Sequence, residues 1–225
     1  MSTSDIVFLF DVDNTLLDND RFQHELGEYL RNSHGDRTYD RYWALFEEIR
    51  SELGYADYLG AIERCRLEHP HQPRILQAAS WLLGYPFADC LYPNALAAVR
   101  HMRQWGPVVI LSDGDAIFQP HKIERSGLWR AFDGQVLIYI HKEKELQDVE
   151  RWHPAKRYVL IDDKLRVLDA VKNIWGERVT TIFPRQGRYA LDAAALAALR
   201  PADIAIDNVG DLTQYDLEAL RRGRE

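Results

Sequence analysis

An apolar run that leads directly into two acidic residues constrains the fold of this chain more than any other stretch. Residues 6–10 read Ile-Val-Phe-Leu-Phe, and Asp11 and Asp13 follow them. An unbroken apolar run of this length is typical of a strand buried on both faces of a parallel sheet. Both carboxylates then lie at the carboxyl end of the strand, where open parallel sheets bind ligands. Two carboxylates so close together repel each other, and a bound cation or a proton would relieve the repulsion.

A simpler explanation of the acidic stretch is that it caps the helix that follows. Asp13, Asn14 and Thr15 belong to residue types that favour helix N-termini. The stretch alone does not choose between a helix cap and a functional site, so the rest of the chain has to decide.

Strand-like and helix-like segments alternate along the chain, apart from one long helical segment. Residues 18–84 carry apolar residues at helical spacing and no strand-like run. Further strands are expected at residues 108–111, 136–140, 158–161, 179–183 and 204–206, with helices between them and a final helix near residues 212–221. The alternation predicts an α/β fold, a parallel sheet with helices on both faces. Residues 1–17 and 89–225 then form the core, and residues 18–88 form a helical cap inserted after the first strand.

The composition limits the partners of the chain. Its 225 residues hold 28 Lys and Arg against 35 Asp and Glu, a net charge of −7. Nucleic acid is not expected as a partner, because phosphate backbones require clustered basic residues. Residues 1–5 lack the features of a signal peptide, and no apolar stretch approaches the roughly 20 residues of a membrane span. Cys65 and Cys90 lie outside any CxxC motif and are expected to be buried thiols in a reducing cytoplasm.

Four of the predicted strands are followed by polar residues at their carboxyl ends. Each set alone has a plain explanation, such as a solvated lysine or a helix cap. Their occurrence in order after successive apolar strands is harder to explain in that way, because the carboxyl ends of parallel strands line one crevice. In chain order the sets are Asp11 and Asp13, Ser112 and Asp113, His141 and Lys142, and Asp162 and Asp163.

This combination of side chains suits phosphoryl transfer. A carboxylate can act as a covalent nucleophile through an aspartyl-phosphate, and a second carboxylate can protonate the leaving oxygen and then activate water. A hydroxyl and backbone amides can hold the phosphoryl oxygens, and a lysine offsets the negative charge. Further carboxylates can hold a hard cation, most naturally Mg²⁺.

The four sets resemble the motifs of the haloacid dehalogenase (HAD) superfamily. Residues 11–15 match its DxDx[T/V] signature, Ser112 the hydroxyl motif, Lys142 or Lys144 the lysine motif, and Asp162-Asp163 the acidic motif in its Asp-Asp form. The resemblance implies a Rossmann-like HAD core with a helical C1 cap. The acidic motif departs from the longer family form, which has another Asp four residues on, so both aspartates have to serve together.

The resemblance also assigns roles to residues. It implies that Asp11 is the nucleophile and a Mg²⁺ ligand, and that Asp13 is the general acid and base and gives its backbone carbonyl to the metal. Asp162 or Asp163 would complete the metal ligands. Thr15, Ser112 and the Asp113 amide would bind the phosphoryl group. We prefer Lys142 to Lys144 as the charge-screening lysine, because a residue directly after a strand points into the crevice.

The resemblance favours a cytoplasmic, Mg²⁺-dependent phosphatase that acts on a small phosphorylated metabolite as a monomer or homodimer. Haloacid dehalogenases proper lack an acidic residue two positions after the nucleophile, so Asp13 argues against dehalogenation. A phosphomutase needs the same residues and stays open, and so does a non-catalytic phosphate-binding module. Arg185 follows the fifth predicted strand, and we expect it to contact the substrate or the cap, although an exposed loop is an equally good interpretation.

Overall fold

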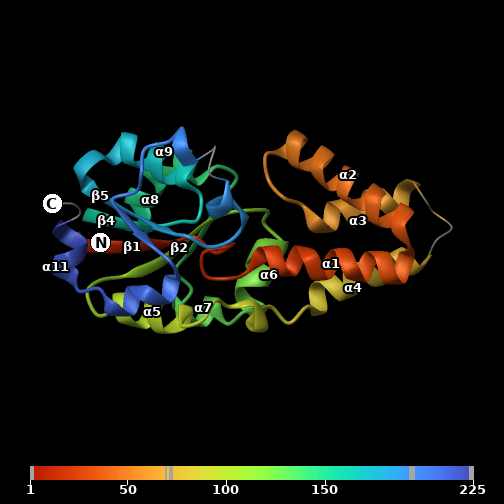
Figure 1. Cartoon of the computed structure of the whole chain (residues 1–225), viewed down its shortest axis with the longest axis horizontal. Helices are drawn as coiled ribbons and strands as arrows, with labels where there is room; N and C mark the ends of the chain where they lie inside the picture. Colours follow the sequence, from red (N-terminus) through yellow and green to blue (C-terminus); the bar gives the residue numbers. More distant parts are fainter. Residues whose placement is uncertain (1–2, 69, 71–72, 193–195, 223–225) are drawn as a thin grey trace.

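The computed structural model places a parallel sheet with helices on both faces beside a separate group of helices (Figure 1). It describes residues 3–68, 70, 73–192 and 196–222. All strand pairs are parallel, in the order β3-β2-β1-β4-β5-β6. The strands are β1 (Ser4–Phe10), β2 (Val108–Asp113), β3 (Val136–Tyr139), β4 (Ala155–Ile161), β5 (Val179–Pro184) and β6 (Ile204–Ile206). The predicted α/β fold is therefore confirmed.

The first strand lies in the middle of the sheet and is buried on both faces. Phe8 pairs with Val108 of β2 on one side and with Val159 of β4 on the other. Ile6, Phe8 and Phe10 belong to one apolar cluster, whereas Val7 and Leu9 belong to another, as the alternation of side chains along a strand requires. Its carboxyl end consequently faces the ends of both neighbouring strands.

Helices cover each face of the sheet. One apolar cluster receives α5 (Ala95–Met102), α6 (Phe118–Arg125), α7 (Leu128–Ala131) and α11 (Leu217–Arg222). The other receives α8 (Leu146–Trp152) and α9 (Leu165–Trp175), and Figure 1 shows these two groups on opposite sides of β1. Short 3₁₀ turns connect several elements: η1 (Pro73–Ile75), η2 (Phe87–Cys90), η3 (Lys142–Lys144), η4 (Gly176–Arg178), η5 (Arg188–Leu191) and η6 (Val209–Gln214).

The helical segment after β1 consists of α1 (Asn19–His34), α2 (Asp36–Leu53), α3 (Tyr58–Glu68) and α4 (Leu76–Gly84). Aromatic rings pack at its centre, where the centroid of Phe22 lies 5.1 Å from that of Tyr58 and 5.0 Å from that of Tyr85. The chain leaves and re-enters the sheet region at adjacent points, because Asp18 N donates to Cys90 O at 2.7 Å. This arrangement agrees with an insert, and its definition as a domain of residues 18–88 stays a prediction.

The end of the described chain differs from the sequence interpretation, which expects one helix over residues 212–221. The segment instead contains the 3₁₀ turn η6 and the short helix α11. A capping box of Asn208 and Asp211 starts the turn, and the extended backbone of Tyr215 separates it from α11. Within the described residues, no helix has both the length and the apolarity needed to cross a membrane.

Candidate active site

The loop after β1 folds back tightly and sends its two acidic side chains to different partners. The carbonyl of Val12 accepts hydrogen bonds from the amides of Leu16 and Leu17, each at 2.9 Å. Asn14 has a φ of +59°. Its side-chain oxygen accepts from the amides of Asn19 (3.0 Å) and Asp20 (3.1 Å), so Asn14 helps to cap α1 together with the N-cap residue Asp18, which accepts from the amide of Arg21. The helix-cap explanation therefore holds for Asn14 and leaves both aspartates for other contacts.

Asp11 forms a buried ion pair with Lys142. The distance from Lys142 Nζ to Asp11 Oδ1 is 2.5 Å, and the same ammonium lies 2.6 Å from Asp162 Oδ2. It also donates to the carbonyl of Leu111 at 3.1 Å. Lys144 is exposed to solvent. The structure therefore brings Lys142 to the predicted nucleophile, as strand-end geometry predicts, and leaves Lys144 outside.

Charge at this point of the site is dense and shielded from water. Burial alone would lower the pKa of Lys142, but the carboxylates of Asp11, Asp162 and Asp113 outweigh it and raise that pKa well above its ordinary value. Lys142 thus keeps its positive charge at any physiological pH. A fixed ammonium beside a carboxylate nucleophile is suited to screening an approaching anion.

Thr15 links the carboxylate of Asp11 to the backbone after β4. Its hydroxyl donates to Asp11 Oδ2 at 3.3 Å and accepts from the backbone amide of Asp163 at 3.0 Å. The side chain is fully buried. Both bonds hold the carboxylate of Asp11 against the end of β4, so Thr15 supports Asp11 in this geometry. Phosphoryl binding by Thr15 stays a prediction.

The end of β2 positions Ser112 and Asp113. The hydroxyl of Ser112 is buried, accepts from Gln119 Nε2 at 2.9 Å and donates to the carbonyl of Asp113 at 3.2 Å. The carboxylate of Asp113 accepts from the backbone amide of Lys142 at 2.9 Å, which fixes the turn that carries the lysine. Phosphoryl binding by Ser112 and by the Asp113 amide stays a prediction.

The two aspartates after β4 are buried and have unequal surroundings. Asp162 Oδ1 accepts from the amide of Lys164 at 2.8 Å, and its other oxygen faces Lys142. Burial raises the pKa of Asp162 to about 6, against the opposing effect of Lys142. Neither carboxylate oxygen of Asp163 has a hydrogen-bond partner among the described residues. Burial, reinforced by the Asp11 carboxylate, raises the pKa of Asp163 well above its ordinary value.

Three of these carboxylates lie close enough to hold one metal ion. Asp11, Asp162 and Asp163 each offer an oxygen, and the three oxygens lie within 4.8 Å of one another. A buried carboxylate without a hydrogen bond is costly, and a hard cation would satisfy it. The donor set therefore fits a divalent cation such as Mg²⁺. The side chain of Asp13 is not part of this cluster, and the contact predicted for its backbone carbonyl stays a prediction.

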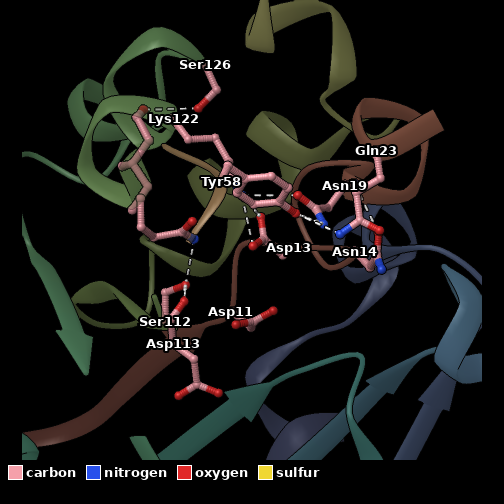
Figure 2. A network of polar contacts seen from close by, with 12 residues as sticks. Asp11, Asp13, Asn14, Asn19, Gln23, Tyr58, Ser112, Asp113, Lys122 and Ser126 are labelled. Carbon is pink, nitrogen blue, oxygen red and sulfur yellow. Dashed lines mark hydrogen bonds and ion pairs between the residues drawn. The ribbon is translucent and has the colours of Figure 1, made fainter. Parts of the chain in front are cut away.

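Asp13 pairs with a lysine that the sequence analysis missed. Lys122 Nζ lies 2.7 Å from Asp13 Oδ1 and 2.9 Å from Oδ2 (Figure 2). Lys122 comes from α6 and has a side-chain exposure of 1%, whereas that of Asp13 is 26%. The available signal was helical spacing, because Phe118, Lys122 and Ile123 share the buried face of α6. A lysine on that face needs a buried partner.

Within the part of the chain that the structure describes, the side chain of Arg185 contacts Asp207 and reaches neither the cavity nor the helical insert. Its side chain is exposed and lies 3.4 Å from Asp207. Three residues later the same loop does reach the insert, since Arg188 Nη1 donates to Gln23 Oε1 at 2.9 Å and Arg188 N donates to Asp20 Oδ2 at 2.7 Å. In this geometry Arg188 makes the contact with the insert, and contact of Arg185 with a substrate stays a prediction.

Gln186 of this loop joins β5 to the loop that carries the aspartates. Its side-chain nitrogen donates to the carbonyls of Asn14 (3.1 Å) and Thr15 (3.0 Å), and its oxygen accepts from Val209 N at 2.6 Å. All polar atoms of this buried amide are used within the protein. Gln186 thus stabilises the backbone next to Asp13, and its side chain has no free polar atom with which to bind a ligand.

A cavity of about 580 Å³ separates the sheet edge from the helical insert. It is far larger than a phosphoryl group and has the size of a site for a small organic molecule. Its lining mixes acidic, basic and aromatic side chains from both parts of the chain, among them Asp13, Asp113 and Lys164 from the core and Phe46, Arg50 and Tyr58 from the insert.

The fold and the carboxylate cluster are those of a Rossmann-like hydrolase, and comparison with known proteins supplies the family. A sequence profile of the haloacid dehalogenase-like hydrolases matches residues 7–180, a span that holds all four motifs. The chain therefore belongs to the haloacid dehalogenase-like hydrolase family. A search of curated proteins found no significant match.

Solved structures support the same fold. A haloacid dehalogenase-like hydrolase from Burkholderia xenovorans is 53% identical, with a TM-score of 0.91 over 96% of this chain and 99% of that one. An L-2-haloacid dehalogenase from Xanthobacter autotrophicus with covalently bound chloropropionic acid is 16% identical, with a TM-score of 0.61 over 92% and 96%. The HAD hydrolase YfnB from Bacillus subtilis, bound to magnesium, is 14% identical, with a TM-score of 0.62 over 94% and 98%. The last two likenesses are evidence for the fold alone.

Proposed function

We propose that the chain is a Mg²⁺-dependent phosphatase that hydrolyses a small phosphorylated metabolite through an aspartyl-phosphate on Asp11. The observation that carries this proposal is the pairing of Asp11 with Lys142 beside Asp163, whose carboxylate is buried and unpartnered among the described residues. A nucleophile, a lysine ammonium and carboxylates that could bind a metal ion then lie together at the carboxyl end of the sheet. Phosphoryl transfer needs that concentration of positive charge.

In the first step Asp11 attacks phosphorus. A bond forms from its carboxylate oxygen, the bond from phosphorus to the ester oxygen breaks, and the leaving oxygen takes a proton from Asp13. The ammonium of Lys142 screens the nucleophile from the anionic phosphoryl group, and the Thr15 hydroxyl keeps the Asp11 carboxylate oriented.

In the second step water attacks the phosphorus of the aspartyl-phosphate. Asp13 accepts a proton from that water, inorganic phosphate leaves, and the carboxylate of Asp11 is restored. Asp13 suits this role because it lines the cavity and is partly exposed, so a water molecule can reach it.

Asp11 and Asp163, with Asp162, would hold the metal ion. When bound, Mg²⁺ supplies positive charge that offsets the carboxylates and stabilises the charge on the transferring phosphoryl oxygens. Asp163 is the better candidate for direct ligation, since Asp162 is engaged by Lys142 and by the amide of Lys164.

The substrate would occupy the cavity between the sheet edge and residues 18–88, which would act as a cap over it. Enclosure of the cavity by the cap would limit access of bulk water and select the organic part of the substrate. A cavity of about 580 Å³ favours a metabolite over a phosphorylated protein.

Dehalogenation is the alternative that structural neighbours raise, and Asp13 argues against it. The resemblance implies that dehalogenases keep the nucleophile but lack an acidic residue two positions later. A buried lysine devoted to Asp13 is one more reason to expect that the carboxylate has a use in this chain.

The test is turnover of two substrates by the purified chain. p-Nitrophenyl phosphate is assayed for phosphate release with Mg²⁺ and with a chelator, and L-2-chloropropionate is assayed for halide release. A panel of phosphorylated metabolites then identifies the preferred substrate. Analysis of organic products separates hydrolysis from transfer to a second hydroxyl, the phosphomutase outcome.

We expect Mg²⁺-dependent phosphate release, no halide release, and loss of turnover in Asp11→Asn. Halide release without metal would replace the proposal by dehalogenation. Binding of phosphorylated compounds without any turnover would replace it by a regulatory binding module.

A further inference from the structure

Lys122 has a position that the proposed reaction does not yet explain. It enters from α6, on the core, and ends between the loop that carries Asp13 and the first turn of α1, on the helical insert (Figure 2). Its side chain is buried, and it is not among the described residues that line the cavity. It therefore contacts Asp13 without facing a substrate.

Three oxygen atoms surround the ammonium of Lys122. Besides the two carboxylate oxygens of Asp13 at 2.7 and 2.9 Å, the side-chain oxygen of Asn19 accepts from it at 3.1 Å. An ammonium has three protons to donate, so these bonds use all of them. The rings of Phe22 and Tyr58, with centroids 5.9 and 5.8 Å from Nζ, lie against the same group.

The contacts continue from Lys122 into the insert. Asn19 Nδ2 donates to the hydroxyl of Tyr58 at 3.4 Å, and Gln23 Nε2 donates to the same hydroxyl at 2.7 Å. Gln23 in turn accepts from Arg188 of the core at 2.9 Å. An unbroken chain of hydrogen bonds thus joins Asp13 to α1, α3 and η5.

We propose that Lys122 is a positioning residue that ties the carboxylate of Asp13 to the first turn of α1 and to Tyr58. Asp13 then keeps one orientation at the edge of the cavity as long as the helical insert rests against α6. The expected effect on turnover rests on the proposed function. The tie between core and insert, which is the set of hydrogen bonds from Lys122 to Asp13 and Asn19, does not rest on it.

Lys122→Met tests the proposal, because Met fills a similar volume without donating. The matched control is Lys172→Met. Lys172 is also a largely buried lysine with one carboxylate partner, Asp203 at 2.9 Å, but it lies on α9 beside the carbonyl of Val179, away from the cavity. With p-nitrophenyl phosphate and Mg²⁺, we expect Lys122→Met to lower kcat about 10- to 100-fold. KM should change less than about 3-fold, since Lys122 does not line the cavity.

Amide hydrogen exchange measures the tie without any substrate. Lys122→Met should accelerate exchange in residues 19–23 and 58–62 and leave the strands unchanged, and Lys172→Met should leave both segments unchanged. Asn19→Ala should accelerate the same two segments while it keeps the ion pair of Lys122 and Asp13, so it serves if Lys122→Met does not fold.

The outcomes separate the two proposals. If the wild-type chain releases no phosphate from any substrate, the proposed function fails, and hydrogen exchange still decides the tie. If wild type turns over and Lys122→Met keeps its kcat, or if exchange in the strands rises as much as in α1 and α3, Lys122 is only a structural ion pair and the inference is overturned.

Discussion

Two buried lysines flank the loop of Asp11 and Asp13, and they are compensated differently. Lys142 begins the turn η3, which follows β3, and contacts two carboxylates, those of Asp11 and Asp162. Lys122 comes from a helix and contacts one carboxylate, that of Asp13. If Asp11 is lost, Lys142 still has Asp162 as a partner. If Asp13 is lost, Lys122 keeps a buried positive charge without a carboxylate partner. We therefore expect the two aspartates to contribute unequally to the stability of the fold.

Asp11→Asn should have the largest effect on turnover. It removes the proposed nucleophile, so kcat should fall by roughly 10⁴-fold or more. Stability should change little, because Lys142 keeps Asp162 within 2.6 Å and the Asn side chain still accepts from Thr15. Phosphate release and urea unfolding of the same preparation measure the two quantities. Retained Mg²⁺-dependent activity would overturn the covalent mechanism.

Asp13→Asn should lower both turnover and stability. Loss of the proposed general acid and base should reduce kcat by about 10²- to 10⁴-fold. The free energy of unfolding should fall by about 3 kcal/mol, the low end for a broken buried pair, because Asp13 is partly exposed.

The double variant Asp13→Asn/Lys122→Met separates these effects. Removal of both charges should restore most of the lost stability and none of the lost turnover. If Asp13→Asn alone is as stable as Asp11→Asn, the two lysines do not differ as we infer, and the comparison fails.

Lys142→Met should reduce kcat by about 10²- to 10³-fold, since it removes the cation beside the nucleophile. Lys144→Met is the matched control two residues away, and its exposed side chain predicts unchanged kinetics. Steady-state rates on p-nitrophenyl phosphate at saturating Mg²⁺ compare the pair. An effect confined to Lys144→Met would reverse the assignment made from strand-end geometry.

Sequence reasoning succeeded where a short segment determines the position of a side chain. An apolar strand ends at a defined edge of the sheet, and parallel neighbours end there too, so the proximity of Asp11, Lys142 and Asp162 followed from topology. The same argument separated Lys142 from Lys144. The catalytic and metal-binding roles of these residues stay predictions.

Contacts between residues far apart in the sequence could not be predicted, because they depend on how the helices and loops pack. Lys122 is 109 residues from Asp13, and its burial depends on how the helical insert rests on α6. The role of Thr15 depends on an amide 148 residues away. Arg188 reaches the insert through the local path of the chain after Gly187, whose φ of +65° is one that glycine adopts readily.

The smallest expected effect concerns the metal. It tests whether the carboxylates around Lys142 need a second cation to offset their negative charge. Burial raises the pKa of Asp162 to about 6 and that of Asp163 well above its ordinary value. The folded state then binds protons more strongly than the unfolded state. Without metal, the contribution of these groups to stability should be fully present below about pH 4 and be lost as the pH rises through 6 and beyond.

Mg²⁺ should reverse this loss at high pH. At pH 8 and a metal concentration 100 times Kd, the free energy of unfolding should rise by about 2.7 kcal/mol, and at pH 5 by less, because protons compete for the same oxygens. Asp163→Asn should abolish the Mg²⁺ response. Asp115→Asn is the control, since Asp115 lies at the cavity outside the cluster and accepts from the amides of Ile117 and Phe118. An equal thermal shift with Mg²⁺ in Asp163→Asn and in wild type would move the metal away from Asp163, and the ammonium groups of Lys142 and Lys164 would then have to offset the charge of the cluster.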